Sequence, residues 1–144
     1  MSDITPKTRR HKGTRMHEPI SQETEELARE TIDAAFQVHK SLGPGLLESV
    51  YEVCLCHELA HRGIPFQRQL NLPVVYQDVR LDAGLRLDIV VRESIILELK
   101  AVETMIPLYE AQLLTYLKLT NMRLGFLINF NVPVIKDGVK RMVN

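Results

Sequence analysis

Two carboxylates and one ammonium group lie close together in the sequence, within or beside apolar segments. Asp88 stands inside the apolar run from Leu85 to Val91. Glu98 and Lys100 stand at the end of a second run, which begins at Ile95. Burying an ion costs on the order of several kcal/mol even after the protein relaxes. Three ionisable groups in two such runs indicate a site, most simply a divalent cation held by the carboxylates with the lysine beside it.

A hairpin between the two runs would bring the carboxylates together if its connection has an odd number of residues. With three connecting residues, 92–94, Val91 would pair with Ile95, and Asp88 would lie opposite Glu98 with the Cβ atoms about 5 Å apart. A two-residue connection would move Asp88 to the other face of the sheet. Two carboxylates this close repel each other unless a cation lies between them. The alternative is a surface hairpin that carries an ordinary salt bridge.

A polar pair on a later helix could face these groups. Gln112 and Tyr116 are four residues apart in a segment that is predicted to be helical over 107–120, so they share one face of that helix. The helix follows Lys100 after a short loop. The amide and the hydroxyl could then hold a phosphate or orient a ligand. The alternative is an ordinary exposed glutamine and a tyrosine at the edge of the core.

A third acidic residue lies at the start of an earlier helix. Glu48 follows Gly45 and precedes Tyr51 by three residues. The helix dipole favours a carboxylate in the first turn, which is a sufficient structural explanation. The functional alternative makes Glu48 an additional acidic group that reaches the metal.

Length and composition define a single domain without a membrane span. The chain has 144 residues with a formal net charge of zero. No apolar run approaches the roughly 20 residues that a membrane span requires, and the N-terminus lacks the apolar segment of a secretory signal. We expect residues 1–18 to form a disordered basic tail and residues 19–144 to form one folded domain. The tail could add non-specific affinity for phosphate backbones, or it could have no role.

The cysteine and histidine content excludes several kinds of site. Cys54 and Cys56 are the only cysteines, too few for an iron–sulfur cluster or a four-cysteine zinc site. We expect both to be reduced and largely buried, which favours a cytoplasmic location. His57 and His61 have helical spacing, but no third zinc ligand is evident. Gly43-Pro44-Gly45 lacks the Gly-Lys-Ser/Thr that completes a phosphate-binding loop.

Hydrophobic periodicity and turn residues predict the order ααβββαββ. This order is typical of the mixed α/β (α+β) class, with helices packed on a central mixed sheet. We expect helices over about 21–40, 46–62 and 107–120, an extended segment over 66–77 that is interrupted at Pro73, a turn or short hairpin over 78–84, strands over 85–91 and 95–99, a doubly buried strand over 123–130, and a last strand or hairpin over 134–143.

Taken together, these motifs resemble a known superfamily. Asp88, Glu98-x-Lys100 and Gln112-x-x-x-Tyr116 resemble the PD-(D/E)xK nuclease superfamily in its RecB-type branch. The segment from Gly45 to Tyr51, Gly-Leu-Leu-Glu-Ser-Val-Tyr, resembles the motif of the GxxExxY family within that superfamily. The likeness covers about residues 22–143. Leu87 replaces the proline of the superfamily's name, a position that supplies no ligand.

The resemblance implies a restriction-endonuclease-like core and a metal-dependent nuclease, with DNA a more probable substrate than RNA. Magnesium or manganese would be held by Asp88, Glu98, the backbone carbonyl of Leu99 and Glu48. Lys100 would orient the attacking water or stabilise the transition state, and Gln112 and Tyr116 would position the nucleic-acid strand. The alternative is a non-catalytic nucleic-acid-binding or scaffold module with the same fold. A homodimer is compatible with either function.

Overall fold

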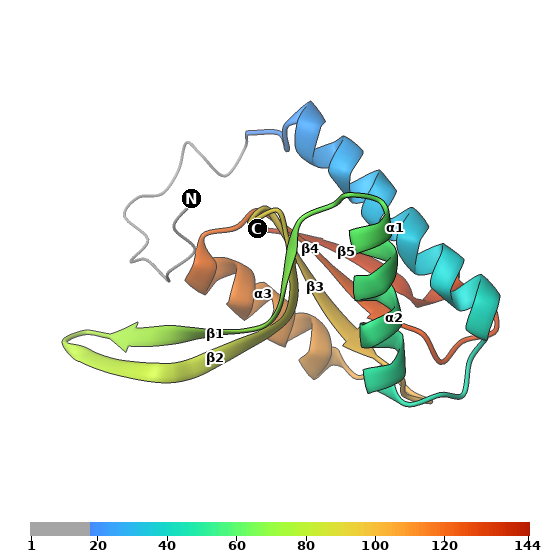
Figure 1. Ribbon diagram of the computed structural model, residues 1–144. Helices are drawn as coiled ribbons and strands as arrows, with labels where there is room; N and C mark the ends of the chain where they lie inside the picture. Colours follow the sequence, from blue (N-terminus) through green and yellow to red (C-terminus); the bar gives the residue numbers. More distant parts are fainter. Residues whose placement is uncertain (1–17) are drawn as a thin grey trace.

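The computed structural model describes residues 18–144, which form a mixed five-stranded sheet between two layers of helices (Figure 1). The expected order of elements is confirmed. The helices are α1 (Gln22–Leu42), α2 (Glu48–His61) and α3 (Pro107–Thr120), with a short 3₁₀ helix η2 (Ile135–Gly138). The strands are β1 (Phe66–Tyr76), β2 (Val79–Val91), β3 (Ile95–Lys100), β4 (Leu124–Asn129) and β5 (Val139–Val143).

Local signals set the ends of the helices. The Ser21 hydroxyl accepts a hydrogen bond from the Thr24 backbone at 3.1 Å and so caps α1. Pro107 occupies the first turn of α3, where a missing backbone N–H costs nothing. Helix α2 begins at Glu48, two residues later than predicted, because Leu46 lies in a bend and Leu47, the N-cap, is extended.

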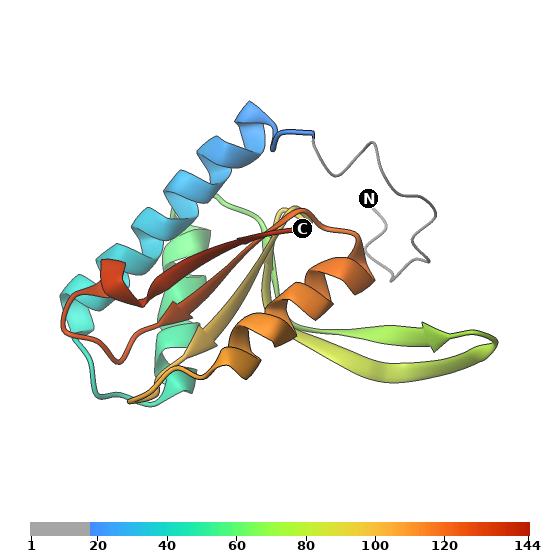
Figure 2. The ribbon, with the colours of Figure 1, turned by 180° about the vertical axis from the view of Figure 1, so that it is seen from behind.

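The strand order is β1-β2-β3-β4-β5, and the only parallel pair described is β3 with β4. Helix α3 makes the crossover between these two strands. Helices α1 and α2 cover one face of the sheet and α3 covers the other, so the sheet separates two apolar cores (Figures 1 and 2). Every residue of β4 is buried, which confirms the prediction of a strand enclosed on both faces.

The β1–β2 hairpin extends well beyond the helices as an arm (Figures 1 and 2). The sequence prediction of a turn or short hairpin over 78–84 was wrong for most of this segment. The turn contains only residues 77–78, because Tyr76 already pairs with Val79, and β2 runs on from there. The pairing shifts register beside Pro73, at the predicted interruption. The outer part of the arm exposes four large apolar side chains, Val75, Tyr76, Val79 and Leu81.

The C-terminal segment forms η2 and then one strand, β5. Gly138, the last residue of η2, lies in close contact with β4: a Cβ at this position would clash with the backbone oxygen of Asn129. Only glycine fits this approach, which places η2 and the start of β5 beside the end of β4.

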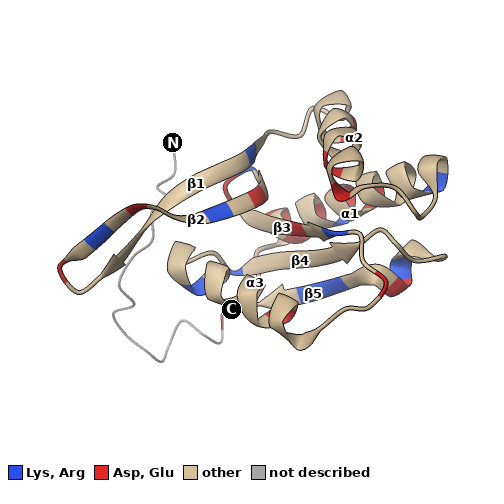
Figure 3. Cartoon of the chain, turned by 90° about the horizontal axis from the view of Figure 1, so that it is seen from below, with Lys and Arg blue, Asp and Glu red and all other residues tan. Residues whose placement is uncertain are grey.

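The remaining sequence predictions concern membrane spans, the distribution of charge and the basic tail. Across residues 18–144, no helix is long and apolar enough to cross a membrane. Acidic and basic segments are interspersed along the chain in the view of Figure 3. The predicted tail at residues 1–18 lies almost entirely outside the described residues.

Candidate metal centre

The β2–β3 hairpin has the register that the site prediction required. Val91 pairs with Ile95, and Ile89 pairs with Leu97. The connection contains three residues, 92–94, and the Ser94 N–H donates to the Val91 oxygen at 2.9 Å. The paired part of β2 and β3 ends at Ile89 and Leu97, immediately before Asp88 and Glu98 would meet. The two carboxylates therefore lie where these strands separate.

Beyond Ile89 and Leu97, hydrogen bonds to the Asp88 and Glu98 side chains replace the backbone-to-backbone hydrogen bonds between β2 and β3. The Asp88 backbone N–H donates to Glu98 Oε2 at 3.0 Å, and the Leu99 N–H donates to Asp88 Oδ2 at 2.9 Å. Each carboxylate is thus fixed by a backbone group of the opposite strand. Their second oxygens, Asp88 Oδ1 and Glu98 Oε1, make no hydrogen bond with residues 18–144. One oxygen of each carboxylate is therefore held by the strands, and the other remains for a ligand.

The electrostatics of the pair disfavour two negative charges. Glu98 is 5% exposed, and burial, together with repulsion from Asp88, raises its pKa to about 8. Burial also raises the pKa of Asp88, with a smaller contribution from Glu52, although the Leu99 N–H opposes this shift. Both shifts arise mainly from burial, and the positive charge nearby is too small to reverse them. A divalent cation between the carboxylates would supply that charge.

The backbone carbonyl of Leu99 lies on the same side of β3 as its N–H. Lys100 O accepts from Phe130 N at 2.9 Å, so the even-numbered residues of β3 bond to β4. Residues alternate in this respect along a parallel strand, and Leu99 therefore directs its N–H and its C=O toward β2. The bond from the Leu99 N–H to Asp88 agrees with this direction. Two carboxylate oxygens, one carbonyl and water form a set of oxygen donors that suits Mg²⁺ or Mn²⁺.

Lys100 lies beside the carboxylates and stacks on an aromatic ring. Its Nζ is 4.3 Å from the centre of the Tyr109 ring, in the first turn of α3. Its positive charge acts to lower the pKa of Asp88 and of Glu98 against the larger effect of burial. A cation–π contact of this kind limits the positions that a flexible lysine can take. The sequence prediction missed Tyr109, since nothing in its spacing marked it as a partner of Lys100.

Glu48 lies near the pair but does not form a closed cage with it. It is the first residue of α2, and partial burial, followed by repulsion from Asp88, raises its pKa. Among residues 18–144, no three His, Cys, Asp or Glu side chains are grouped closely enough to enclose an ion by themselves. In Figure 1 the β3 arrow points to the end of the sheet at which α2 and α3 begin. The positive ends of both helix dipoles therefore lie on the side of Glu98 and Lys100.

The two polar residues of α3 differ in how they relate to the site. Burial raises the pKa of Tyr116, and the charges of Glu98 and Asp88 raise it further, which places its hydroxyl within their electrostatic range. Gln112 is half-buried on the same helix face, one turn earlier. Leu113 and Leu117, on the neighbouring stripe, are fully buried against the sheet. The polar stripe of α3 therefore follows the edge of the core.

Two buried polar residues that the sequence prediction missed support the site. Glu52, one turn after Glu48, is 4% exposed and binds side chains of β1. Asn129, at the end of β4, accepts from the Val102 and Asn131 backbone N–H groups, both at 3.1 Å, and donates to the Val102 oxygen at 3.0 Å. Asn129 thereby fixes the chain just after Lys100. The sequence could have pointed to Glu52, because it is a charged residue four positions after Glu48 on a buried helix face.

The segment from Gly45 to Tyr51 has a structural role that explains its residue types. Gly45 has φ +99°, a conformation that L residues with a side chain rarely adopt. The Tyr51 hydroxyl donates to Gly43 O at 2.6 Å and accepts from Leu46 N at 3.1 Å. Its ring is fully buried and stacks on Phe130, with the ring centres 4.6 Å apart. Tyr51 therefore ties the loop before Glu48 to the end of β4.

Tyr51→Phe is expected to lower the free energy of unfolding by about 1–2 kcal/mol, because the Gly43 carbonyl and the Leu46 N–H lose their shared partner while the ring stack remains. Urea denaturation, followed by circular dichroism, measures the change. Tyr76→Phe, at an exposed position on the arm, is the control and should change the free energy by less than about 0.5 kcal/mol. Equal effects of the two substitutions would contradict this account of Tyr51.

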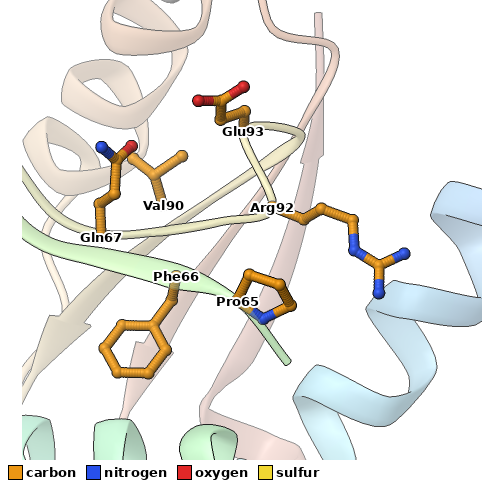
Figure 4. Close-up of a pocket in the computed structure, with 6 residues that line it drawn as sticks. All are labelled: Pro65, Phe66, Gln67, Val90, Arg92 and Glu93. Atoms are coloured by element: carbon orange, nitrogen blue, oxygen red, sulfur yellow. The ribbon is translucent and has the colours of Figure 1, made fainter. Parts of the chain in front are cut away.

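One pocket of about 270 Å³ lies away from these residues (Figure 4). It is lined by Pro65, Phe66, Gln67, Val90, Arg92 and Glu93, so it lies at the β2–β3 turn, at the other end of β3 from Glu98. Arg92 extends from it toward α1, where its Nη1 is 3.7 Å from Glu23 Oε2. The candidate metal centre is defined by its side chains and not by this pocket.

Both cysteines are free thiols. Cys56 is buried, which raises its pKa to about 11, and Cys54 is partly buried against the same core. The expectation of unpaired, largely buried cysteines therefore holds for Cys56, whereas Cys54 is unpaired but only partly buried.

The comparisons with known proteins agree with the fold and with the strand-end carboxylates. A family model described as the PD-(D/E)XK nuclease superfamily matches residues 25–142, nearly all of the described chain and every candidate site residue. The chain therefore belongs to the PD-(D/E)XK nuclease superfamily. No curated protein and no solved structure matches it. Members of this superfamily generally use divalent metals, and the oxygen donors around Asp88 and Glu98 fit such an ion.

Proposed function

We propose that this protein is a metal-dependent nuclease that hydrolyses phosphodiester bonds, with Asp88, Glu98 and Lys100 as its central residues. The reciprocal hydrogen bonds between the two strands, which hold two carboxylates together and leave one oxygen of each for a ligand, are the observation that supports it most directly. Membership of the superfamily supports the same reaction class. The substrate class that follows from this reaction is nucleic acid.

The proposed ligands of Mg²⁺ or Mn²⁺ are the Asp88 and Glu98 carboxylates and the Leu99 carbonyl, with Glu48 completing the shell directly or through water. When bound, the ion lowers the pKa of a coordinated water and neutralises charge on the phosphate. Lys100, whose Nζ is held over Tyr109, orients the attacking water or stabilises negative charge that develops on the phosphate oxygens.

The polar stripe of α3 is proposed to position the substrate. Tyr116 can donate a hydrogen bond to a phosphate oxygen, and its raised pKa keeps the hydroxyl protonated. Gln112 lies one turn nearer the start of α3 and can donate through its amide. Contacts of this type fix the register of a strand without reading its sequence.

The finer assignment rests on the motifs. We propose membership of the GxxExxY family and of the RecB-type branch, on the segment from Gly45 to Tyr51 and on Gln112-x-x-x-Tyr116. We propose DNA as the preferred substrate and the cytoplasm as the location. Residues 19–144 would form the catalytic domain, and the basic segment 1–18 would make an additional contact with phosphate. A homodimer is the proposed assembly, because two copies would provide a wider binding surface.

Purified protein incubated with single-stranded DNA, duplex DNA and RNA tests the function. We expect cleavage of at least one substrate with Mn²⁺ or Mg²⁺, and none with Ca²⁺ alone or with a chelator, because the reaction needs an ion that both binds oxygen donors and activates water. Gel electrophoresis of end-labelled substrates detects the products. Binding of nucleic acid without cleavage under every metal condition would favour the non-catalytic module instead.

A further inference from the structure

A buried charged cluster connects α2 to the strand that pairs with the Asp88 segment. Glu52, on α2, is almost fully buried and accepts from Arg68 Nε at 2.5 Å. It also accepts from Gln69 Nε2, at 2.8 Å to Oε1 and 3.0 Å to Oε2. Two consecutive residues of β1 are therefore held by one carboxylate. Burying a carboxylate is costly unless it is paired, and this geometry satisfies both oxygens.

The second of these residues has an unusual backbone conformation. Gln69 has φ +52° inside β1, where a strand residue ordinarily has a negative φ. For a residue with a side chain, the left-handed region is unfavourable and persists only where the surroundings enforce it. The bonds from Glu52 to the Gln69 side chain supply such a constraint.

In both β1 and β2, the inward-facing apolar side chains switch from one face of the sheet to the other near Gln69. In β1, Phe66 packs in the core that faces α1 and α2, whereas Leu70 packs in the core that faces α3. In β2, Ile89 packs in the first core and Leu87 in the second. Strict alternation would put each of these pairs on one face. The change occurs at Gln69 in β1 and at Asp88 in β2.

The pairing on either side of this point shows that the two residues are opposite each other. Arg68 pairs with Ile89, and Leu70 pairs with Leu87, with the same register on both sides. Gln69 and Asp88 lie between these two pairs. The left-handed turn at Gln69 is thus coupled to the place where Asp88 leaves the ladder and directs its carboxylate to Leu99 N.

We propose that Glu52 is a positioning residue: by holding Arg68 and Gln69, it fixes the left-handed turn of β1 that places the Asp88 carboxylate beside Glu98. The effect of Glu52 on the reaction rests on the function proposed above, whereas its effect on the position of Asp88 does not. Glu52 positions Asp88 through its bonds to β1, and its negative charge also acts on Asp88 across the intervening space.

Hydrogen exchange of the metal-free, full-length protein, followed by NMR, tests the positioning directly. The Leu99 N–H reports on Asp88, because the Asp88 carboxylate is its acceptor. In Glu52→Gln we expect Leu99 exchange to rise at least tenfold more than that of Leu127, a buried residue of the interior strand β4. Taking the ratio to Leu127 removes any general loss of stability.

Two further variants make the result specific. Gln69→Val keeps the Glu52–Arg68 pair but places a β-branched residue at the left-handed position, so the same local rise at Leu99 is expected even if Glu52→Gln folds poorly. Glu58→Gln removes a different ion pair of α2, with Arg62 at 2.8 Å, and should leave the Leu99-to-Leu127 ratio unchanged. A Leu99 rise no larger than that of Leu127 in both test variants would overturn the inference.

Titration calorimetry with Mn²⁺ then tests the consequence for the metal centre. Glu52→Gln should weaken Mn²⁺ binding at least tenfold, while Glu58→Gln should match the wild type. Unchanged Mn²⁺ affinity together with faster Leu99 exchange would also overturn the role of Glu52 in positioning the ligand. A wild-type protein that neither binds Mn²⁺ nor cleaves nucleic acid would refute the proposed function, and the metal-free exchange result would still show whether Glu52 positions Asp88.

Discussion

Asp88→Asn, Glu98→Gln and Lys100→Gln should each lower metal-dependent cleavage by at least about 10³-fold, since each removes a charge that the reaction needs at the phosphate. The first two should also weaken Mn²⁺ binding, because an amide oxygen is a poorer ligand than a carboxylate. Lys100→Gln should leave Mn²⁺ binding within about threefold of wild type. Initial cleavage rates and titration calorimetry distinguish a lost ligand from a lost catalytic group.

The structure supplies matched controls for this series. Asn and Gln retain an oxygen that can accept the bonds from Leu99 N and Asp88 N, so the fold should persist. Asp82→Asn, on the exposed arm, and Lys140→Gln, on β5, change the same residue types outside the centre. Both should retain cleavage within about threefold. An Asp88→Asn or Glu98→Gln protein with wild-type cleavage would remove these residues from the mechanism.

The second large effect is on stability: removing the charge of Glu98 should make the metal-free protein more stable. Without metal, Glu98→Gln should be more stable than wild type by roughly 2–4 kcal/mol at pH 8. The pKa of Glu98 is about 8 in the folded protein and 4.5 in its ordinary state, so the folded form retains a proton that the unfolded form releases. The stability of the wild type should therefore fall as the pH rises from about 4.5 to about 8, and a neutral amide avoids this loss.

Thermal unfolding in a chelator at several pH values measures this difference. The stability of Glu98→Gln should show a weaker dependence on pH in that interval, and the two proteins should converge near pH 4.5, where both side chains are neutral. Saturating Mn²⁺ should raise the Tm of the wild type much more than that of the variant, since only the wild type has both carboxylates. A wild-type stability that increases between pH 5 and pH 8 without metal would contradict the assigned pKa.

The features that the sequence determined by itself are those with a local physical origin. The sequence left two lengths open for the β2–β3 connection, and the structure has the three-residue connection, 92–94, that the site prediction required. Ser21 and Pro107 marked the starts of two helices through the chemistry of the first turn. The nearly continuous apolar run over 123–130 identified the doubly buried strand.

The limits of the sequence prediction are clearest in the arm. The segment 78–84 contains polar residues and a glycine, which locally favour a turn, but its pairing with β1 extends the strand back to Val79. Hydrogen bonds between strands come from residues that are distant in the chain, so local propensity cannot specify them. The length of the arm beyond the helices follows from this pairing.

Tertiary structure alone decided how the candidate centre is held. The reversal of faces at Gln69 and Asp88, the buried bonds of Glu52 and the stacking of Lys100 on Tyr109 all join separate elements. A helix or strand pattern depends on neighbours within a few residues, and so the sequence could single out the two carboxylates and the hairpin register that would bring them together. The contacts that fix the orientation of the carboxylates form only after α2, the sheet and α3 have packed together, so the sequence pattern could not predict them.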